Sequence, residues 1–191
     1  MNRPESELAL KLARQAIELW VKEKKKLKPK GLPKSFSEKK GVFVTIYTWP
    51  EKELRGCIGY PEPYFPLDEG IVNAAMHACQ DPRFEPLRPD ELNSIITEVS
   101  VLTKPKLLKA KNPEDYRAQI NIGRDGLIVQ RGPRSGLLLP QVASEHGMDT
   151  HEFLIETSLK AGLPPTAWME PSAKVYTFQT EIFSEAEPEK V

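Results

Sequence analysis

Long apolar segments are missing from this sequence of 191 residues. The longest stretch without a charged residue, Gly70–Gln80, has 11 residues, whereas a membrane-spanning helix needs about 20. The first six residues also lack the apolar segment of a secretory signal. We therefore expect a cytoplasmic protein that has no membrane partner.

Cysteine and histidine are scarce, with 2 and 3 residues respectively. Cys57 and Cys79 are too few for a disulfide framework, and no zinc-finger spacing occurs. The phosphate-binding patterns GxGxxG and GxxxxGK[ST] are absent as well. The sequence thus predicts no metal site and identifies no cofactor.

A net charge is absent too, because 27 Lys and Arg residues balance 27 Asp and Glu residues. The balance hides an asymmetry, since residues 22–40 carry nine lysines against Glu23 and Glu38. A lysine run can contact the phosphates of nucleic acid, but this one has no arginine and no aromatic platform for bases. We interpret it as a solvated helix end and loop, with nucleic-acid binding as the alternative.

The patterns that are present favour an α+β fold, in which flanking helices cover a mixed or antiparallel sheet. Helices and strands alternate irregularly, and hairpins join several strands. The last strand is expected over 174–183, with the tail from Glu185 frayed. The expected helices are 5–27, 69–80 with Asp68 as its cap, a short helix from 112, 141–146, and 150–161 with Asp149 as its cap. The other expected strands are 41–49, 54–60, 95–103 and a hairpin within 123–139.

The densest local feature is Leu54-Arg55-Gly56-Cys57-Ile58-Gly59. Residues two apart share a face of a strand, so Arg55 and Cys57 are expected to point the same way. A guanidinium near a thiol favours the thiolate, and the flanking glycines allow a ligand or another backbone to approach closely. Cys57 is the candidate nucleophile and Arg55 the candidate activating or substrate-binding cation. The alternative is that Cys57 is a small buried apolar residue.

A second feature is the turn Asp81-Pro82-Arg83-Phe84, in which Asp81 can orient Arg83. An oriented arginine binds a carboxylate or phosphate, so both residues are candidate substrate-binding residues. The alternative is a purely structural turn. Three more arginines lie in predicted turns: Arg124, Arg131 and Arg134. Together with Arg55 and Arg83 they can line an anion-binding cleft. The alternative is that they are exposed turn residues.

Glu98 interrupts an otherwise apolar strand. A carboxylate in such a place usually has a partner or a shifted pKa, so Glu98 is a candidate acid or base, with a salt bridge at a sheet edge as the alternative. A nucleophilic thiol usually needs a histidine base. None of the three histidines has a spacing that specifies one.

Taken together, these segments resemble the AMMECR domain family over about residues 5–184. The resemblance is carried, in order along the chain, by Leu54–Gly59, Asp81–Leu87, Glu98–Leu102, Gly123–Leu127, Gly136–Ala143 and Lys160–Trp168. It implies a single domain with two subdomains and a cleft near the LRGCIG segment. The residues after this domain, 185–191, are expected to form an acidic tail. The resemblance does not imply a known reaction.

In many microbes members of this family are linked with a Memo-like protein and a radical SAM protein. The resemblance therefore implies a shared modification pathway or complex. The chain itself lacks the CxxxCxxC cluster motif of radical SAM enzymes. Two hypotheses follow: a small-molecule or modification-pathway enzyme that uses a cleft around Cys57, or a non-catalytic partner of a Memo-like or radical SAM protein.

Overall fold

The computed structural model describes residues 1–188 and divides the chain into two compact units. Unit 1 combines residues 1–102 with the chain from Glu181 onward, and unit 2 is Thr103–Thr180. Each unit has its own hydrophobic core and its own four-stranded sheet. The predicted α+β class is confirmed, because both units combine helices with antiparallel strand pairs.

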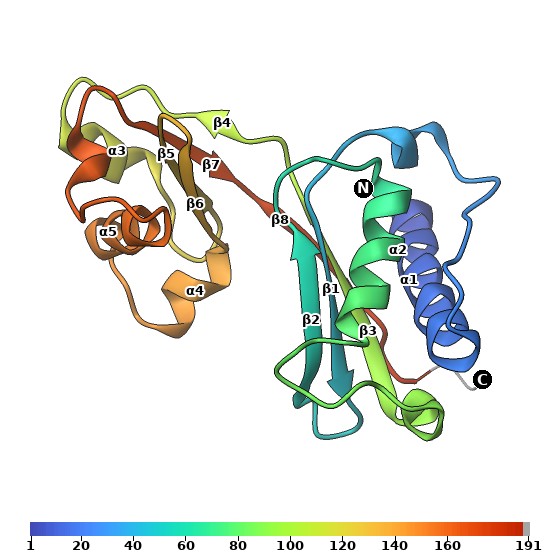
Figure 1. Ribbon diagram of the computed structural model, residues 1–191. Coiled ribbons are helices and arrows are strands. Elements are labelled where there is room, and N and C mark those ends of the chain that lie inside the picture. Colours follow the sequence, from blue (N-terminus) through green and yellow to red (C-terminus); the bar gives the residue numbers. More distant parts are fainter. Residues whose placement is uncertain (189–191) are drawn as a thin grey trace. The chain divides into compact units, whose positions relative to one another are not determined.

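In unit 1 the strands are ordered β2-β1-β3-β8, so β2 and β8 are the edge strands. Helices α1 and α2 lie side by side along the sheet (Figure 1). The elements of this unit are α1 (Arg3–Glu23), β1 (Val42–Thr48), β2 (Leu54–Tyr60), α2 (Leu67–Ala78), β3 (Ile95–Leu102) and β8 (Thr180–Ser184), with short 3-10 helices at Lys34–Ser37 and Pro89–Ser94.

The two faces of the unit 1 sheet differ because side chains alternate along each strand. In β1, Val42, Val44 and Ile46 are fully buried in the core together with apolar residues of α1 and α2. Thr45 points to the opposite face, where its direct neighbours on β2 and β3 also lie. The face away from the helices is therefore the one that carries polar chemistry.

Helix α1 begins and ends where local capping sets its limits. The Asn2 side chain accepts from the Glu5 N–H and the Glu5 side chain accepts from the Asn2 N–H, a capping box. At the other end Lys24 adopts a left-handed conformation, with φ of 55°, so the helix stops at Glu23. The predicted helix 5–27 is correct in kind, but it starts two residues earlier and ends four residues earlier than expected.

In unit 2 the strands are ordered β4-β7-β5-β6. Trp168 and Phe153 are almost completely buried in its core. The elements of this unit are β4 (Lys106–Leu107), α3 (Pro113–Gln119), β5 (Gly126–Arg131), β6 (Arg134–Leu138), α4 (Pro140–Glu145), α5 (Thr150–Lys160) and β7 (Lys174–Phe178), with a 3-10 helix at Ala167–Met169.

The prediction of one long strand over 174–183 is wrong. Two strands, β7 and β8, occupy this stretch and belong to different sheets. The break lies at Gln179, whose backbone N–H donates to Thr103 Oγ1 and whose carbonyl accepts from the Thr103 N–H, both at 2.8 Å. The alternating pattern runs through this point unbroken, so the sequence gives no sign of the change of sheet.

Two smaller predictions are also corrected. Helix α2 begins at Leu67 after Pro66, without a side-chain cap, so Asp68 lies inside its first turn. Glu185 is not frayed: its carboxylate pairs with the fully buried guanidinium of Arg14 and accepts from the Thr97 N–H. The end of the predicted tail, residues 189–191, lies outside the described residues. No helix among the described residues is long and apolar enough to cross a membrane.

Candidate functional site

Cys57 lies in the middle of β2, the edge strand of the unit 1 sheet. Its backbone points to the open side of the strand, where a neighbouring strand is missing. There the Cys57 N–H donates to Asp81 Oδ2 at 2.9 Å, and Arg83 Nη2 donates to the Cys57 carbonyl at 3.3 Å. These two contacts, which we call the Asp81–Arg83 clamp, replace the hydrogen bonds of a neighbouring strand and fix the backbone of Cys57.

Asp81 is the buried centre of the clamp, at 2% exposure. Its carboxylate accepts from Arg83 Nη2 at 2.6 Å, from Arg83 Nε and from the Arg83 N–H. The hydrogen bonds from Arg83, together with the one from the Cys57 N–H, hold the pKa of Asp81 far below its usual range. Arg83 itself keeps more than half of its side chain exposed. The predicted orientation of Arg83 by Asp81 is thus present in the geometry.

Gly56 explains how the clamp reaches β2. A Cβ atom at this position would lie 2.2 Å from the carbonyl oxygen of Ala78, at the end of α2. Only glycine therefore lets α2 come so close that the turn after it can place Asp81 beside the strand. Gly59 has a different neighbour, because a Cβ there would collide with the Phe43 ring. Both glycines therefore allow other atoms of the protein to approach β2 closely.

Cys57 belongs to a polar row that crosses the sheet. Its direct partner on β1 is Thr45, and the direct partner of Thr45 on β3 is Glu98. Opposite residues share a face of the sheet, so the three side chains lie on one face. The Thr45 hydroxyl donates to Cys57 Sγ at 3.2 Å, and the Ser184 hydroxyl on β8 donates to the Glu98 carboxylate. We call Cys57, Thr45, Glu98 and Ser184 the cross-strand row.

Arg55 is bound by a carboxylate that the sequence analysis did not single out. Its Nε and Nη2 donate to the two oxygens of Glu91 at 2.8 and 3.1 Å, and its Nη1 donates to the Glu85 carbonyl. Burial alone would raise the pKa of Glu91, but the hydrogen bonds from Arg55 and from the Arg88 N–H lower it. The charge of Arg55 is therefore compensated, and its role as an activating cation stays a prediction.

His77, the histidine of unit 1, is bound on the face of β2 opposite to Cys57. His77 Nδ1 is 2.7 Å from the hydroxyl of Tyr60, and Tyr60 shares its face of β2 with Ile58, opposite to Cys57. His151 and His146 belong to unit 2, where the His151 ring packs edge-on against Trp168. Within residues 1–188, no three His, Cys, Asp or Glu side chains form a group that could hold a metal ion.

The two cysteines have different surroundings. Cys79 is 2% exposed, its thiol donates to the Ala75 carbonyl, and burial raises its pKa to about 12. It is a residue of the unit 1 core. Cys57 is half-buried and forms no disulfide bond, so it is less shielded by the protein than Cys79.

Arg124, Arg131 and Arg134 belong to unit 2, whereas Arg55 and Arg83 belong to unit 1. Each of the three unit 2 arginines has a partner. Arg124 pairs with the buried carboxylate of Asp125, Arg131 with Glu170, and Arg134 donates to the Gly162 carbonyl. Burial alone would raise the pKa of Asp125, but hydrogen bonds led by that of Arg124 lower it to about 2. Arg124 and Asp125 line a pocket of about 350 Å³ with Gln179.

The lysine-rich segment follows the end of α1. Lys24 lies over the Trp20 ring at 5.9 Å, and Lys25 and Lys40 pair with Glu23 and Glu38. The described segment forms a helix end, an exposed loop and the 3-10 helix at Lys34–Ser37. Nucleic-acid binding by this segment stays a prediction.

Three of the predicted site residues thus meet in unit 1 around β2, because Asp81 and Arg83 contact the backbone of Cys57. Glu98 lies two strands away on β3, where its carboxylate accepts from Ser184 on β8. Sequence reasoning missed Thr45 and Ser184, which supply the hydroxyl groups of the cross-strand row. The signal for Thr45 was a polar residue inside an apolar, β-prone segment.

The sequence and the structure of this chain were compared with those of known proteins. The chain matches the AMMECR1 family model over residues 10–183. It is 51% identical to the protein MK0488 of Methanopyrus kandleri, over 97% of this chain and 90% of that protein. It is 48% identical to the protein MJ0810 of Methanocaldococcus jannaschii, over 96% and 92% of the two chains. The crystal structure of an uncharacterized protein from Pyrococcus horikoshii, PH0010, matches with a TM-score of 0.84 and 47% identity, over 98% of this chain and 95% of that one.

Proposed function

The chain belongs to the AMMECR1 family, and we propose that it is a small-molecule or modification-pathway enzyme with Cys57 as its reactive thiol. The observation that carries this proposal is the way Cys57 is held. The Asp81–Arg83 clamp binds both the N–H and the carbonyl of this half-buried residue, while its sulfur atom accepts a hydrogen bond from Thr45. A thiol that only fills space needs neither feature.

The cross-strand row supplies the groups that nucleophilic chemistry needs. A hydrogen bond donated to sulfur favours the thiolate over the thiol, which is the role we assign to Thr45. Glu98 lies one strand beyond Thr45 in the row, and we assign it the role of acid or base toward the substrate. The Ser184 hydroxyl keeps the Glu98 carboxylate in place.

Substrate binding is assigned to the exposed part of Arg83, with Asp81 and Arg55 as positioning residues. The Arg83 guanidinium lies beside Cys57 and stays more than half exposed, so it can meet a carboxylate or phosphate of the substrate. Arg55 and Glu91 hold the neighbouring stretch of β2 to the segment that follows the clamp. The thiol must be reduced for this chemistry, which a cytoplasmic location provides.

A chromogenic acyl donor tests the proposal without knowledge of the natural substrate. With p-nitrophenyl acetate, Cys57 Sγ attacks the ester carbonyl, the carbon–oxygen bond to the leaving group breaks, and p-nitrophenolate departs while the acetyl group stays on sulfur. We expect one rapid equivalent of p-nitrophenolate and a single acetyl group on the peptide that contains Cys57. Cys57→Ser should remove both, and Glu98→Gln should slow the burst.

The second candidate function, a non-catalytic partner of a Memo-like or radical SAM protein, is favoured by one observation. The guanidinium groups of Arg55 and Arg83 are both engaged with carboxylates of the chain itself, as in a purely structural arrangement. Pull-down with such a partner separates the two functions. Binding retained by Cys57→Ser together with a lost acetylation burst supports the enzyme, whereas an absent burst in the native chain with intact partner binding supports the scaffold.

A further inference from the structure

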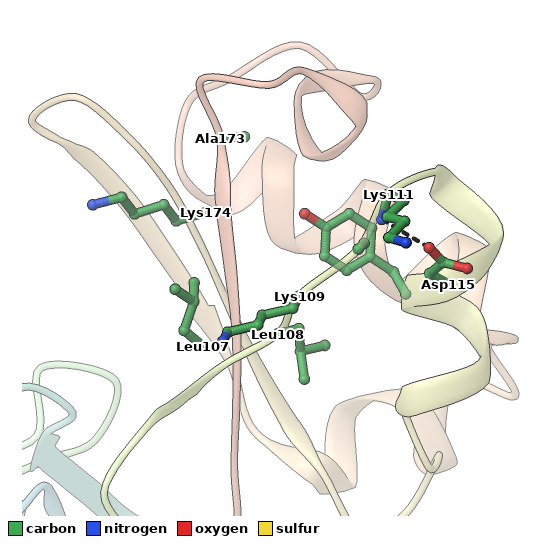
Figure 2. Close-up of a pocket in the computed structure, with 9 residues that line it drawn as sticks. Leu107, Leu108, Lys109, Lys111, Asp115, Ala173 and Lys174 are labelled. Atoms are coloured by element: carbon green, nitrogen blue, oxygen red, sulfur yellow. Dashed lines mark hydrogen bonds between the residues drawn. The ribbon is translucent and has the colours of Figure 1, made fainter.

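Unit 2 contains a pocket that no part of the proposed function uses. Its volume is about 620 Å³, within the range of roughly 300–1,000 Å³ that is typical of small-molecule sites. In the view of Figure 2, Lys174 and Leu107 lie on one side of the pocket, and Lys111 and Asp115 lie on the other. The lining residues come from the β4 segment, the start of α3 and the start of β7: Leu107, Leu108, Lys109, Ala110, Lys111, Asp115, Tyr116, Ala173 and Lys174.

The rim of this pocket is positively charged. Lys109, Lys111 and Lys174 are all exposed, and no described carboxylate forms an ion pair with any of them. The one carboxylate in the lining, that of Asp115, accepts from the backbone N–H groups of Lys111 and Asn112 at 2.7 and 3.2 Å. It is committed to capping α3, so three ammonium groups remain for a ligand.

The walls of the same pocket are apolar. Leu108 and Ala173 are buried side chains of the unit 2 core that border the space, and Leu107 leaves 44% of its surface exposed beside the lysines. The Tyr116 ring is fixed by an edge-on contact with Trp168, with ring centroids 6.2 Å apart. An inorganic ion would use the lysines alone. A ligand with both a charged and an apolar part would use the whole pocket.

We propose that this pocket, bounded by the β4 segment, the start of α3 and the start of β7, binds a small organic anion that carries an aromatic or other apolar group. The lysines contact the anionic group, which stays near the open rim where water completes its solvation. The apolar group covers Leu107 and packs against Leu108 and the Tyr116 ring. This proposal does not rest on the one made for Cys57, so Cys57→Ser should bind the same ligand unchanged.

Three related probes test the proposal on the full chain: 1-naphthyl phosphate, 1-naphthol and inorganic phosphate. We expect 1-naphthyl phosphate to bind at least about tenfold more tightly than either of the others, since it alone combines the two parts. NMR titration should place the shifts on the methyl groups of Leu107 and Leu108. Equal binding of 1-naphthol, or equal binding of inorganic phosphate, overturns the proposal.

Variants locate the site. Ala110→Phe fills the pocket from its half-buried wall and should abolish binding, and Lys109→Gln with Lys174→Gln should weaken it several-fold. Lys160→Gln removes an exposed lysine at the end of α5, outside the lining, and should leave binding unchanged. A similar loss in Lys160→Gln, or full binding in a folded Ala110→Phe variant, contradicts the proposal; near-native thermal melting confirms that each variant is folded.

Discussion

At the residue scale, Cys57 is positioned by contacts from two separate segments of unit 1. Thr45 on β1 contacts its sulfur atom, and the turn after α2 supplies Asp81 and Arg83 for its backbone. A side chain at an edge strand would otherwise sit on a backbone that is free to shift. The clamp gives this edge residue the fixed geometry that a nucleophile requires.

The Thr45 hydroxyl should control the reactivity of Cys57. Thr45→Val keeps the shape of the side chain but removes the hydrogen bond that favours the thiolate. We expect Cys57 to be alkylated roughly three- to tenfold more slowly near pH 7, since hydrogen bonds to charged groups contribute about 1.5–3 kcal/mol and those to sulfur less. Iodoacetamide kinetics followed by peptide mass spectrometry measure this rate.

Thr97→Val is the matched control for this substitution. Thr97 lies on β3, and its buried hydroxyl has no hydrogen-bond partner among the described residues. This variant should react at the wild-type rate. An equal slowing in both variants would mean that the Thr45 hydroxyl has no specific effect on the thiol.

Asp125 should make the protein sensitive to acid. Its pKa of about 2 in the folded chain lies below the ordinary value of 3.8. A lowered pKa stabilises the fold above the unfolded value and loses this effect as the pH falls through the folded one. We expect about 2 kcal/mol of stability to disappear between pH 4 and pH 2.

Urea unfolding across this pH range measures the loss. Asp125→Asn should be less stable than the native chain near pH 6, and its stability should fall less between pH 4 and pH 2. Parallel declines of the two proteins would show that Asp125 does not carry the effect.

At the element scale, local chemistry sets most helix limits, whereas the edge of a sheet needs distant partners. The capping box of Asp149 and Glu152 starts α5 where the sequence predicts it. The range Leu54–Tyr60 of β2 also agrees with the prediction. Its position at the edge of the sheet was not predictable, because that depends on which strands pair, and the clamp that covers this edge joins residues far apart in the chain.

The clamp should contribute to stability as well as to the site. Asp81→Asn removes the buried charge that holds Arg83 and weakens the contact to the Cys57 N–H. We expect a loss of about 2 kcal/mol in the free energy of unfolding, because the carboxylate is buried and its loss leaves donors without an acceptor. Chemical denaturation measures the loss.

Asp90→Asn makes the same change in the exposed Arg88–Asp90 ion pair. Exposed pairs contribute little, so this control should lose much less stability than Asp81→Asn. Equal losses in the two variants would show that the clamp stabilises the fold no more than an exposed ion pair does.

At the scale of the whole molecule, the chain leaves unit 1 after Leu102 and returns to it at Glu181. The returning segment is tied into unit 1 by Glu185, which pairs with buried Arg14 and bridges to β3 through the Thr97 N–H. The sequence predicted the class of fold but not this return. Nothing in the local sequence distinguishes Arg14 from the other polar residues of α1, because its partners are distant: the Leu92 and Ile95 carbonyls and a carboxylate 171 residues away.

Loss of that partner should destabilise unit 1 strongly. Glu185→Gln leaves the buried guanidinium of Arg14 without a compensating charge, which costs about 3 kcal/mol or more. The control Glu187→Gln alters an exposed carboxylate of the same tail and should have almost no effect. A double variant, Arg14→Met with Glu185→Leu, should recover much of the loss; if it is no more stable than Glu185→Gln, the buried charge is not the cause.

The candidate site was predictable in its composition more than in its geometry. Cys57, Asp81 and Arg83 stood out as dense local patterns, and the structure brings them into contact; their functional roles stay predictions. Thr45 and Glu91 could not be identified, because strand register and loop packing bring them to Cys57 and Arg55. A sequence shows which residues can do chemistry, and only the fold shows which of them meet.

The rate at which native Cys57 is alkylated, measured from pH 5 to pH 10, tests the central claim most directly. Cys79 serves as an internal control in the same protein, because it is buried and its pKa is raised to about 12. If Cys57 is a positioned nucleophile, it reacts near pH 7 faster than a cysteine in an unstructured peptide. A profile that matches the free peptide, or one as slow as that of Cys79, would contradict the account.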